Sequence, residues 1–106
     1  MKKENIIKKS YEINKIIENN NVKKNRYFYI YKERNNKNID RFVVCVSKKI
    51  GNAVTRNKIK RQIKDIIDKN KNLFSYQNDY VIIVRKEINN LNYEKISNNL
   101  VQLFKD

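Results

Sequence analysis

The segment GNAVTRNKIKR, residues 51 to 61, concentrates side chains that could bind an anion. It contains two arginines, two lysines, two asparagines and the only glycine of the chain. Arginine presents forked donors that match phosphate oxygens, and lysine acts as a point charge. Asparagine adds a donor and an acceptor that can reach a phosphate, a 2′-hydroxyl or a base edge. These residue types predict that the segment binds a polyanion.

A helix from residue 53 to about residue 69 would gather these side chains into one stripe. At about 100° per residue, five of them fall into one sector of the helix. They are Arg56, Asn57, Lys60, Arg61 and Lys64. The apolar residues of the same helix lie beside that sector and are Ile59, Ile63, Ile66 and Ile67. A cation next to the buried face is partly fixed by its neighbours, so it loses less side-chain freedom when it binds a phosphate.

The start of this helix has a charge pattern that opposes the helix dipole. Cations near a helix N-terminus destabilise it by about 0.3 kcal/mol or more each, and no acidic residue follows until Asp65. Lys48 and Lys49 stand just before the helix. Since a solvated charged face normally mixes both signs, we interpret the stripe as a binding surface. Gly51 and Asn52 must connect the strand to the helix, since glycine can adopt a positive φ and asparagine is a good N-cap.

The composition excludes the usual protein-based catalysts. With no histidine and one cysteine, the chain can form neither a Cys/His zinc cluster nor a Ser-His-Asp or Cys-His nucleophile. The eleven acidic residues are scattered along the sequence, so no acidic metal-ion site is expected. We predict no catalytic residue and no metal ligand, and we expect any chemistry to come from another molecule. Cys45 is expected to be a small buried hydrophobe.

Size and charge favour a single domain that binds a polyanion. The 106 residues suffice for one domain, with residues 1 to 9 as a candidate flexible segment. A net charge of +14 favours nucleic acid, an anionic membrane surface or an acidic protein as partner. The charged N-terminus lacks the apolar region of a signal peptide, and no apolar run reaches the roughly 20 residues of a membrane span. A single cysteine permits no internal disulfide, which fits a cytoplasmic protein.

Hydrophobic periodicity predicts the helices and strands that position the stripe. A first helix covers about residues 11 to 19 with Ser10 as its cap, and a last helix covers about residues 93 to 104 with Asn92 as its cap. The predicted strands are RYFYIYKE (26 to 33), FVVCVS (42 to 47) and DYVIIVR (79 to 85), with a short edge strand near Val22. The continuous apolar run of FVVCVS predicts a central strand that is buried on both faces.

This order of elements predicts an α+β fold, in which helices pack on a small sheet. FVVCVS, the basic helix and DYVIIVR form a βαβ crossover, which makes the two strands parallel neighbours. The general rule for such crossovers predicts a right-handed connection. In RYFYIYKE, Tyr27, Tyr29 and Tyr31 occupy one face, and a half-buried strand face explains Tyr27 and Tyr29 most simply.

The segment SKKIGNAVTRNKIKRQIK, residues 47 to 64, closely resembles the signature of the protein subunit of bacterial ribonuclease P. That family has a lysine-rich strand end followed by GNAVxRNxxKR at the start of a helix. The resemblance implies an αβββαβα two-layer sandwich with a small, mostly antiparallel sheet and a left-handed crossover. It also implies that an RNA subunit is the catalyst and holds most of the Mg²⁺, with none bound by protein side chains alone. The complex would remove the 5′ leader from precursor tRNA.

The resemblance assigns two sets of contact residues. Those that match the contact with ribonuclease P RNA are Lys48, Lys49, Asn52, Arg56, Asn57, Lys60, Arg61 and Lys64. Those that match the contact with the leader are Ile13, Ile17, Arg26 and Tyr31. The family commonly has two phenylalanines in the first helix, where this chain has Ile13 and Ile17. Isoleucine cannot stack as a ring does, so these two positions lack the stacking that a ring supplies, about 1–3 kcal/mol per base.

Two other functions agree with the charge and the fold class. A ribosomal or general RNA-binding module fits them equally well, and only the motif disfavours it. A DNA-binding protein could place the basic helix in a major groove with Arg56 and Asn57 reading bases, but no helix precedes it at turn-helix distance. The sequence indicates neither a membrane nor an obligate protein partner. The expected partners are ribonuclease P RNA and the 5′ leader of precursor tRNA.

Overall fold

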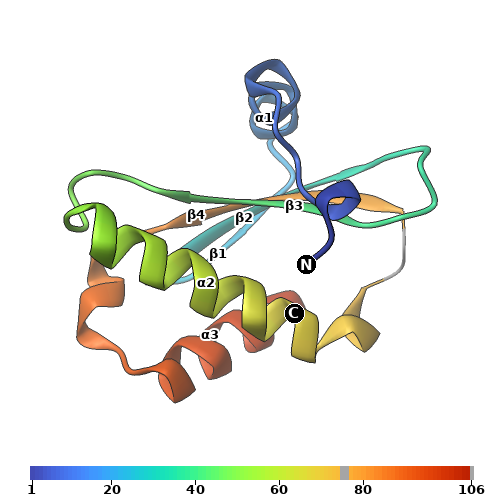
Figure 1. The fold of residues 1–106 in the computed structure, drawn as a ribbon. Helices are drawn as coiled ribbons and strands as arrows, with labels where there is room; N and C mark the ends of the chain where they lie inside the picture. Colours follow the sequence, from blue (N-terminus) through green and yellow to red (C-terminus); the bar gives the residue numbers. More distant parts are fainter. Residues whose placement is uncertain (75–76, 106) are drawn as a thin grey trace.

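Three α-helices pack on a four-stranded sheet in the computed structural model, which describes residues 1–74 and 77–105 (Figure 1). The α-helices are α1 (Ser10–Glu18), α2 (Ala53–Lys69) and α3 (Tyr93–Lys105). The strands are β1 (Val22–Lys24), β2 (Phe28–Arg34), β3 (Arg41–Val46) and β4 (Asn78–Val84). Short 3₁₀ helices are η1 (Lys3–Asn5), η2 (Lys71–Leu73) and η3 (Lys86–Asn90). The predicted α+β class is confirmed.

The sheet has the strand order β1-β2-β4-β3 and contains two kinds of pairing. The β1–β2 and β2–β4 pairs are antiparallel, whereas β3 and β4 are parallel, as predicted for the crossover. The prediction that FVVCVS forms a central strand is wrong, because β3 lies at the edge and β4 lies inside the sheet. A continuous apolar run indicates cover on both faces of a strand, and it does not report which strands are hydrogen-bonded neighbours.

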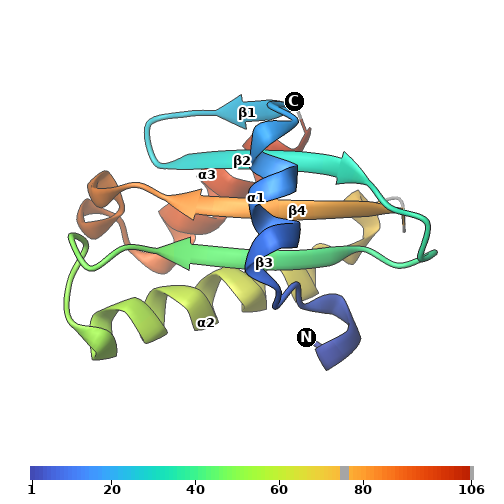
Figure 2. The same ribbon diagram turned by 90° about the horizontal axis from the view of Figure 1, so that it is seen from above.

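Figure 2 shows how α2 connects the two parallel strands. β3 and β4 point the same way, and α2 passes behind the sheet from the end of β3 towards the start of β4. When the sheet is viewed from the side of α2, with β3 and β4 pointing up, β4 lies to the left of β3. The crossover is therefore left-handed, which departs from the general rule and agrees with the expectation from the family resemblance.

The main core lies between the sheet and the pair of helices α2 and α3 (Figure 1). Phe28 of β2 and Ile82 of β4 point into this core, where they meet Ile63 of α2 and Leu100 of α3, and all four are fully buried. The predicted apolar stripe of α2 is confirmed, since its buried residues are Ile59, Ile63, Ile66 and Ile67. This packing fixes the rotation of α2 about its axis and so sets where its charged side chains point.

α1 lies across the opposite face of the sheet (Figure 2). A small second cluster holds it there, in which Ile16, Ile7 and Val81 are almost completely buried. The N–H of Ile7 donates to the carbonyl of Phe42 at 2.9 Å, and Ile6 forms a parallel bridge with the same residue. The candidate flexible segment, residues 1 to 9, therefore contains a stretch that packs against the edge of β3.

Helix caps follow the sequence in two of three places. The side chains of Asn52 and Asn92 each accept a hydrogen bond at 2.9 Å from the backbone three residues later, so both predicted caps are confirmed. Ser10 is not a cap, because it is the first residue of α1, and Lys9 occupies the cap position without a side-chain bond. None of the described helices is long and apolar enough to cross a membrane.

Gly51 does not use the positive φ that glycine permits. Its role is spatial, since a Cβ at this position would lie 3.0 Å from the Cβ and Cγ2 atoms of Thr55. Contacts of that length are tighter than ordinary van der Waals contact. The glycine therefore lets the chain pass close to the first turn of α2 on its way into the helix.

Candidate nucleic-acid interface

The predicted basic stripe occupies one side of α2. Arg56, Lys60 and Lys64, spaced four residues apart, are half-buried, whereas Asn57 and Arg61 are exposed. The half-buried cations therefore lie next to the core-facing side of the helix, as the rotation of about 100° per residue required. None of the four cations forms an ion pair within the described residues.

The acidic residues of α2 do not neutralise this stripe. Asp65 pairs with Lys69 at 3.0 Å, and Asp68 is also paired, so both carboxylates are occupied towards the end of the helix. The first turn contains no acidic residue. The N-terminal half of α2 therefore combines the positive end of the helix dipole with cations that form no ion pair within the described residues.

Arg56 has an incomplete set of hydrogen bonds. Its Nε atom is buried, and it has no hydrogen-bond partner among the described residues. A buried donor without a partner is unfavourable by about 1–3 kcal/mol. A phosphate at this position could accept from it and would also use the forked geometry of the guanidinium.

The loop before α2 presents two further lysines. Ile50 is buried, its N–H donates to the Ser47 carbonyl at 3.1 Å, and its own carbonyl accepts from Asn89 at 2.9 Å. This anchored turn leaves Lys48 and Lys49 exposed next to the start of α2. Asn52 is also exposed, but its side-chain oxygen is used in capping. The side-chain NH₂ group of Asn52 remains available to donate to a ligand.

The face of the sheet that carries α1 contains a half-exposed row of side chains. The strand register aligns Tyr29, Ile83 and Cys45 across three strands, and we call them the open row. They are half-buried, whereas the neighbouring row under α1 contains Val81, which is fully buried. Tyr31 belongs to that neighbouring row and packs against the second cluster with Ile13 and Ile17.

The β2 end of the open row is positively charged. The guanidinium of Arg85 lies 5.1 Å from the centre of the Tyr29 ring, and the Lys24 ammonium lies 6.0 Å from it. Arg85 also donates to the carbonyl of Asn25 at 3.4 Å, which holds it at the turn between β1 and β2. Arg26 follows in that turn and is exposed. An aromatic ring flanked by cations can bind a base by stacking and its phosphate by charge.

The β3 end of the open row meets the basic stripe. Burial raises the pKa of the Cys45 thiol, and the nearby charge of Lys60 partly opposes that shift. α2 packs against β3, the edge strand that carries Cys45, and runs along that side of the sheet (Figure 2). Cys45 is half-buried, so the prediction of a buried hydrophobe is only partly met. The open row and the basic stripe therefore adjoin at the β3 edge.

The four side chains assigned to the leader are not all together. Ile13, Ile17 and Tyr31 meet in the second cluster, whereas Arg26 lies in the β1–β2 turn, beyond the open row. Sequence reasoning missed Arg85 and Lys24, and it treated Tyr29 as ordinary strand surface. Alternation places Arg85 on the same face as Ile83. Only the register between β2 and β4 brings it to Tyr29.

No group of acidic or sulfur ligands suited to a metal ion occurs among residues 1–74 and 77–105. Both oxygens of Asp79 and one oxygen of Glu12 accept hydrogen bonds from Arg41. Magnesium prefers carboxylate and phosphate oxygens in near-octahedral geometry. The described side chains therefore do not fit a magnesium site made by protein alone.

Comparison with known proteins gives matches along the whole chain. The family model described as ribonuclease P matches residues 1–106. The ribonuclease P protein component of Mycoplasma mycoides subsp. mycoides is 40% identical over 107 residues, which cover 100% of this chain and 98% of that protein.

Solved structures agree with the sequence matches. A mutant of the Staphylococcus aureus RNase P protein with defective mRNA degradation activity has a TM-score of 0.89 and 34% identity, and the match covers 97% of this chain and 87% of that one. The RNase P protein of Thermotoga maritima has a TM-score of 0.86 and 25% identity, with 93% of this chain and 94% of that one covered.

Proposed function

The chain belongs to the ribonuclease P protein family, and we propose that it binds two RNA segments on adjoining surfaces. Family members are protein components of an endoribonuclease that processes tRNA. In our proposal the basic stripe and the loop before it bind the RNA subunit. The open row binds the single-stranded 5′ leader of precursor tRNA. The RNA subunit performs the cleavage, and the complex acts in the cytoplasm.

The positive charge of the basic stripe supports the proposed contact with the RNA subunit. The cations of the stripe form no ion pair within the described residues, and Arg56 has a buried donor with no partner. RNA phosphates would satisfy both. The residues assigned to this contact are Lys48, Lys49, Asn52, Arg56, Asn57, Lys60, Arg61 and Lys64.

An exposed ring between cations supports the contact with the leader. Single-stranded RNA is bound mainly by stacking of unpaired bases on aromatic side chains and by charge along the backbone. Tyr29 with Arg85 and Lys24 offers both at one end of the open row. We extend the leader contact from Ile13, Ile17, Arg26 and Tyr31 to these three residues.

The packing of α2 against β3 is the observation that supports the proposal most strongly. α2 carries the basic stripe, and β3, at the edge of the sheet, carries Cys45 of the open row. A leader strand that leaves the open row at the β3 edge would therefore reach the surface proposed for the RNA subunit. This arrangement suits a protein that holds the substrate strand next to a separate catalyst.

Mg²⁺ would be held mainly by the RNA partner in this proposal. The described acidic side chains do not fit a protein-only site, whereas RNA supplies phosphate oxygens. The role of this chain is to bind and orient RNA and to bring positive charge to it. No catalytic residue is assigned to the protein.

Replacing one of two lysines on α2 tests the contact with the RNA subunit. Lys60 lies in the stripe and Lys58 is exposed outside it, so Lys60→Ala and Lys58→Ala remove the same charge from the same helix. We expect Lys60→Ala to weaken assembly with ribonuclease P RNA and to reduce the slope of log K against log salt by about 0.7 to 0.9. Lys58→Ala should leave the slope unchanged. Equal slopes for the two variants would contradict the assigned stripe.

Reconstitution tests where the chemistry occurs. Cleavage of precursor tRNA in Mg²⁺ should require ribonuclease P RNA, and the protein should improve binding of precursor over mature tRNA. The protein alone is assayed in parallel on precursor tRNA and on an mRNA, because a structurally similar protein is described by its mRNA degradation activity. Specific cleavage of precursor tRNA by the protein alone would contradict the proposal.

The RNA that co-purifies with the protein separates the proposal from the alternatives. A single structured RNA supports the ribonuclease P assignment. Ribosomal RNA or a mixture would support a general RNA-binding module, and tight binding to a duplex DNA site at physiological salt would support a DNA-binding protein.

A further inference from the structure

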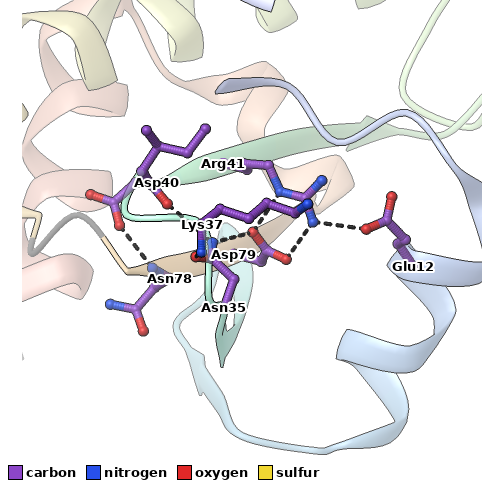
Figure 3. A network of polar contacts seen from close by, with 8 residues as sticks. Glu12, Asn35, Lys37, Asp40, Arg41, Asn78 and Asp79 are labelled. Carbon is purple, nitrogen blue, oxygen red and sulfur yellow. Dashed lines mark hydrogen bonds and ion pairs between the residues drawn. The ribbon is translucent and has the colours of Figure 1, made fainter. Parts of the chain in front are cut away.

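An ion network ties α1 to the sheet (Figure 3), and the strand register places it on the other side of the Val81 row from the open row. The register aligns Glu33, Asp79 and Arg41 across three strands, and we call them the anchored row. Arg41 donates to both oxygens of Asp79, from Nε at 2.9 Å and from Nη2 at 2.7 Å. The same Nη2 donates to the carboxylate of Glu12 on α1 at 2.8 Å. One guanidinium therefore joins two strands and a helix.

The guanidinium is held in place independently of α1. The Asn35 amide donates to Asp79 at 2.7 Å and to the Ile39 carbonyl at 3.1 Å, which ties the β2–β3 loop to the same carboxylate. The Asp40 side chain accepts the backbone N–H of Asn78 at 3.0 Å and fixes the start of β4. The side chains of Arg41 and Asp79 are only 11% and 9% exposed. This preformed site fixes the position to which Glu12 must come.

Glu12 makes the only side-chain hydrogen bond from α1 to another element within the part of the chain that the structure describes. The rest of the attachment is apolar and is centred on Ile16. This apolar contact is small, since Ile16 is the one fully buried side chain of α1, and a charge-assisted hydrogen bond adds a directional restraint to it. Glu12 therefore supplies the directional restraint on the rotation of α1 over the sheet.

The two sides of α1 are linked by helix geometry. Relative to the buried Ile16, Glu12 lies about 40° to one side, whereas Ile13 and Ile17 lie about 60° and 100° to the other. A rotation that releases Glu12 would move Ile13 and Ile17 relative to Tyr31 and the open row. We propose that Glu12, held by Arg41, is a positioning residue that sets how α1 borders the open row and thereby the preference for leader-bearing tRNA. This inference rests on the proposed function.

The variant Glu12→Gln tests the inference, with Glu18→Gln as its matched control. Both changes remove one carboxylate from α1, but Glu18 is exposed and has no ion pair within the described residues. Glu12→Gln leaves the Arg41–Asp79 pair intact, so the fold is retained. In the reconstituted enzyme we expect Glu12→Gln to bind precursor tRNA about fivefold more weakly. This is the change in an equilibrium constant that corresponds to the loss of one partly exposed ion pair. Mature tRNA affinity and assembly with the RNA subunit should match wild type and Glu18→Gln.

A distance measurement separates positioning from general damage. Spin labels at Lys15→Cys on α1 and Lys32→Cys on β2, in a Cys45→Ser background, report the position of the helix over the sheet. We expect the distance distribution to shift or broaden with Glu12→Gln and not with Glu18→Gln, and Glu12→Asp to restore part of the wild-type behaviour.

Two results would overturn the inference while leaving the proposed function intact. They are unchanged discrimination between precursor and mature tRNA in Glu12→Gln, or equal losses for both substrates. If the wild-type protein itself gave no preference for precursor tRNA, the proposed leader contact would fail, and this inference would fail with it.

Discussion

The open row and the anchored row lie on opposite sides of α1, on one face of one sheet, and they differ in chemistry. The open row consists of Tyr29, Ile83 and Cys45, which are half-exposed and bordered by cations that form no ion pair within residues 1–74 and 77–105. The anchored row contains Asp79 and Arg41, which satisfy each other and hold Glu12 of α1. One side of the helix is closed by internal contacts, and the other keeps its interactions available to a ligand.

The difference shows how a small domain can combine rigidity with binding. A buried guanidinium that makes three charge-assisted hydrogen bonds fixes one side of α1. An aromatic ring and cations that form no ion pair within the described residues would bind RNA on the other side. Three acidic residues, Glu12, Glu33 and Asp79, lie on the closed side, where they do not repel a polyanion in the open row. The predictions below alter one row at a time.

The largest effect is expected from Arg41→Ala, which removes the centre of the anchored row. The Asp79 carboxylate is 9% exposed and would lose its cation. Removal of one partner of a buried pair destabilises a protein by about 3–5 kcal/mol. Urea unfolding followed by circular dichroism measures this change. Arg34→Ala, which removes an exposed arginine with no ion pair in the described structure, should change stability by less than about 0.5 kcal/mol.

A result in which both arginine variants unfold at the same urea concentration would contradict this reading of the anchored row. It would mean that the hydrogen bonds of Arg41 contribute no more than solvated surface contacts do.

A smaller effect, on binding instead of stability, is expected from Tyr29→Ala in the open row. Loss of base stacking should weaken precursor tRNA binding by about 1–3 kcal/mol. The affinity for mature tRNA should not change, because mature tRNA has no leader. Tyr29→Phe keeps the ring and should keep most of the affinity. Filter binding with the reconstituted enzyme measures the affinities of both variants for precursor and for mature tRNA. An equal loss of affinity for the two RNAs in Tyr29→Ala would exclude Tyr29 from a leader contact.

The sequence predicted much of the basic stripe but little of either row. Residues in the stripe belong to one helix, so a fixed rotation per residue relates them, and Asn52 caps that helix by a contact only three residues long. The anchored row joins residues 12, 41 and 79, which come together only through the sheet register and the packing of α1. Periodicity reports faces and cannot report such neighbours.

The misassigned features have related causes. FVVCVS was expected to be central because its apolar run indicates burial, yet burial by helices and pairing with strands are separate properties. Ser10 has the side chain of a good cap, but α1 begins one residue earlier than the sequence suggested. Gly51 was explained by its freedom of φ, whereas the structure uses its lack of a Cβ beside Thr55.

The smallest effect is expected in the pH dependence of the Glu12–Arg41 contact. The hydrogen bond from Arg41 lowers the pKa of Glu12 in the folded protein. A lowered folded pKa means that the contact stabilises above the ordinary glutamate pKa of about 4.3, and that this contribution disappears as the pH falls through the lower folded value. The free energy of unfolding of the wild type should therefore exceed that of Glu12→Gln by about 0.5–1 kcal/mol near pH 7.

Urea unfolding from about pH 2.5 to about pH 7, a range that covers the titration of carboxylates, tests the direction of this pH dependence. The difference in free energy of unfolding between wild type and Glu12→Gln should vanish at the acidic end. Glu18→Gln should show no comparable difference from wild type. A gap that persists or widens at the acidic end would contradict the ion pair as the origin of the difference.

Site-specific cross-linking tests the contrast between the two rows most directly. A photoreactive phenylalanine analogue is placed at Tyr29 in the open row or at Glu33 in the anchored row, and each protein is assembled with ribonuclease P RNA and precursor tRNA. The account predicts cross-links to leader nucleotides from position 29 and none from position 33. Equal leader cross-links from both positions, or cross-links from position 33 alone, would contradict it.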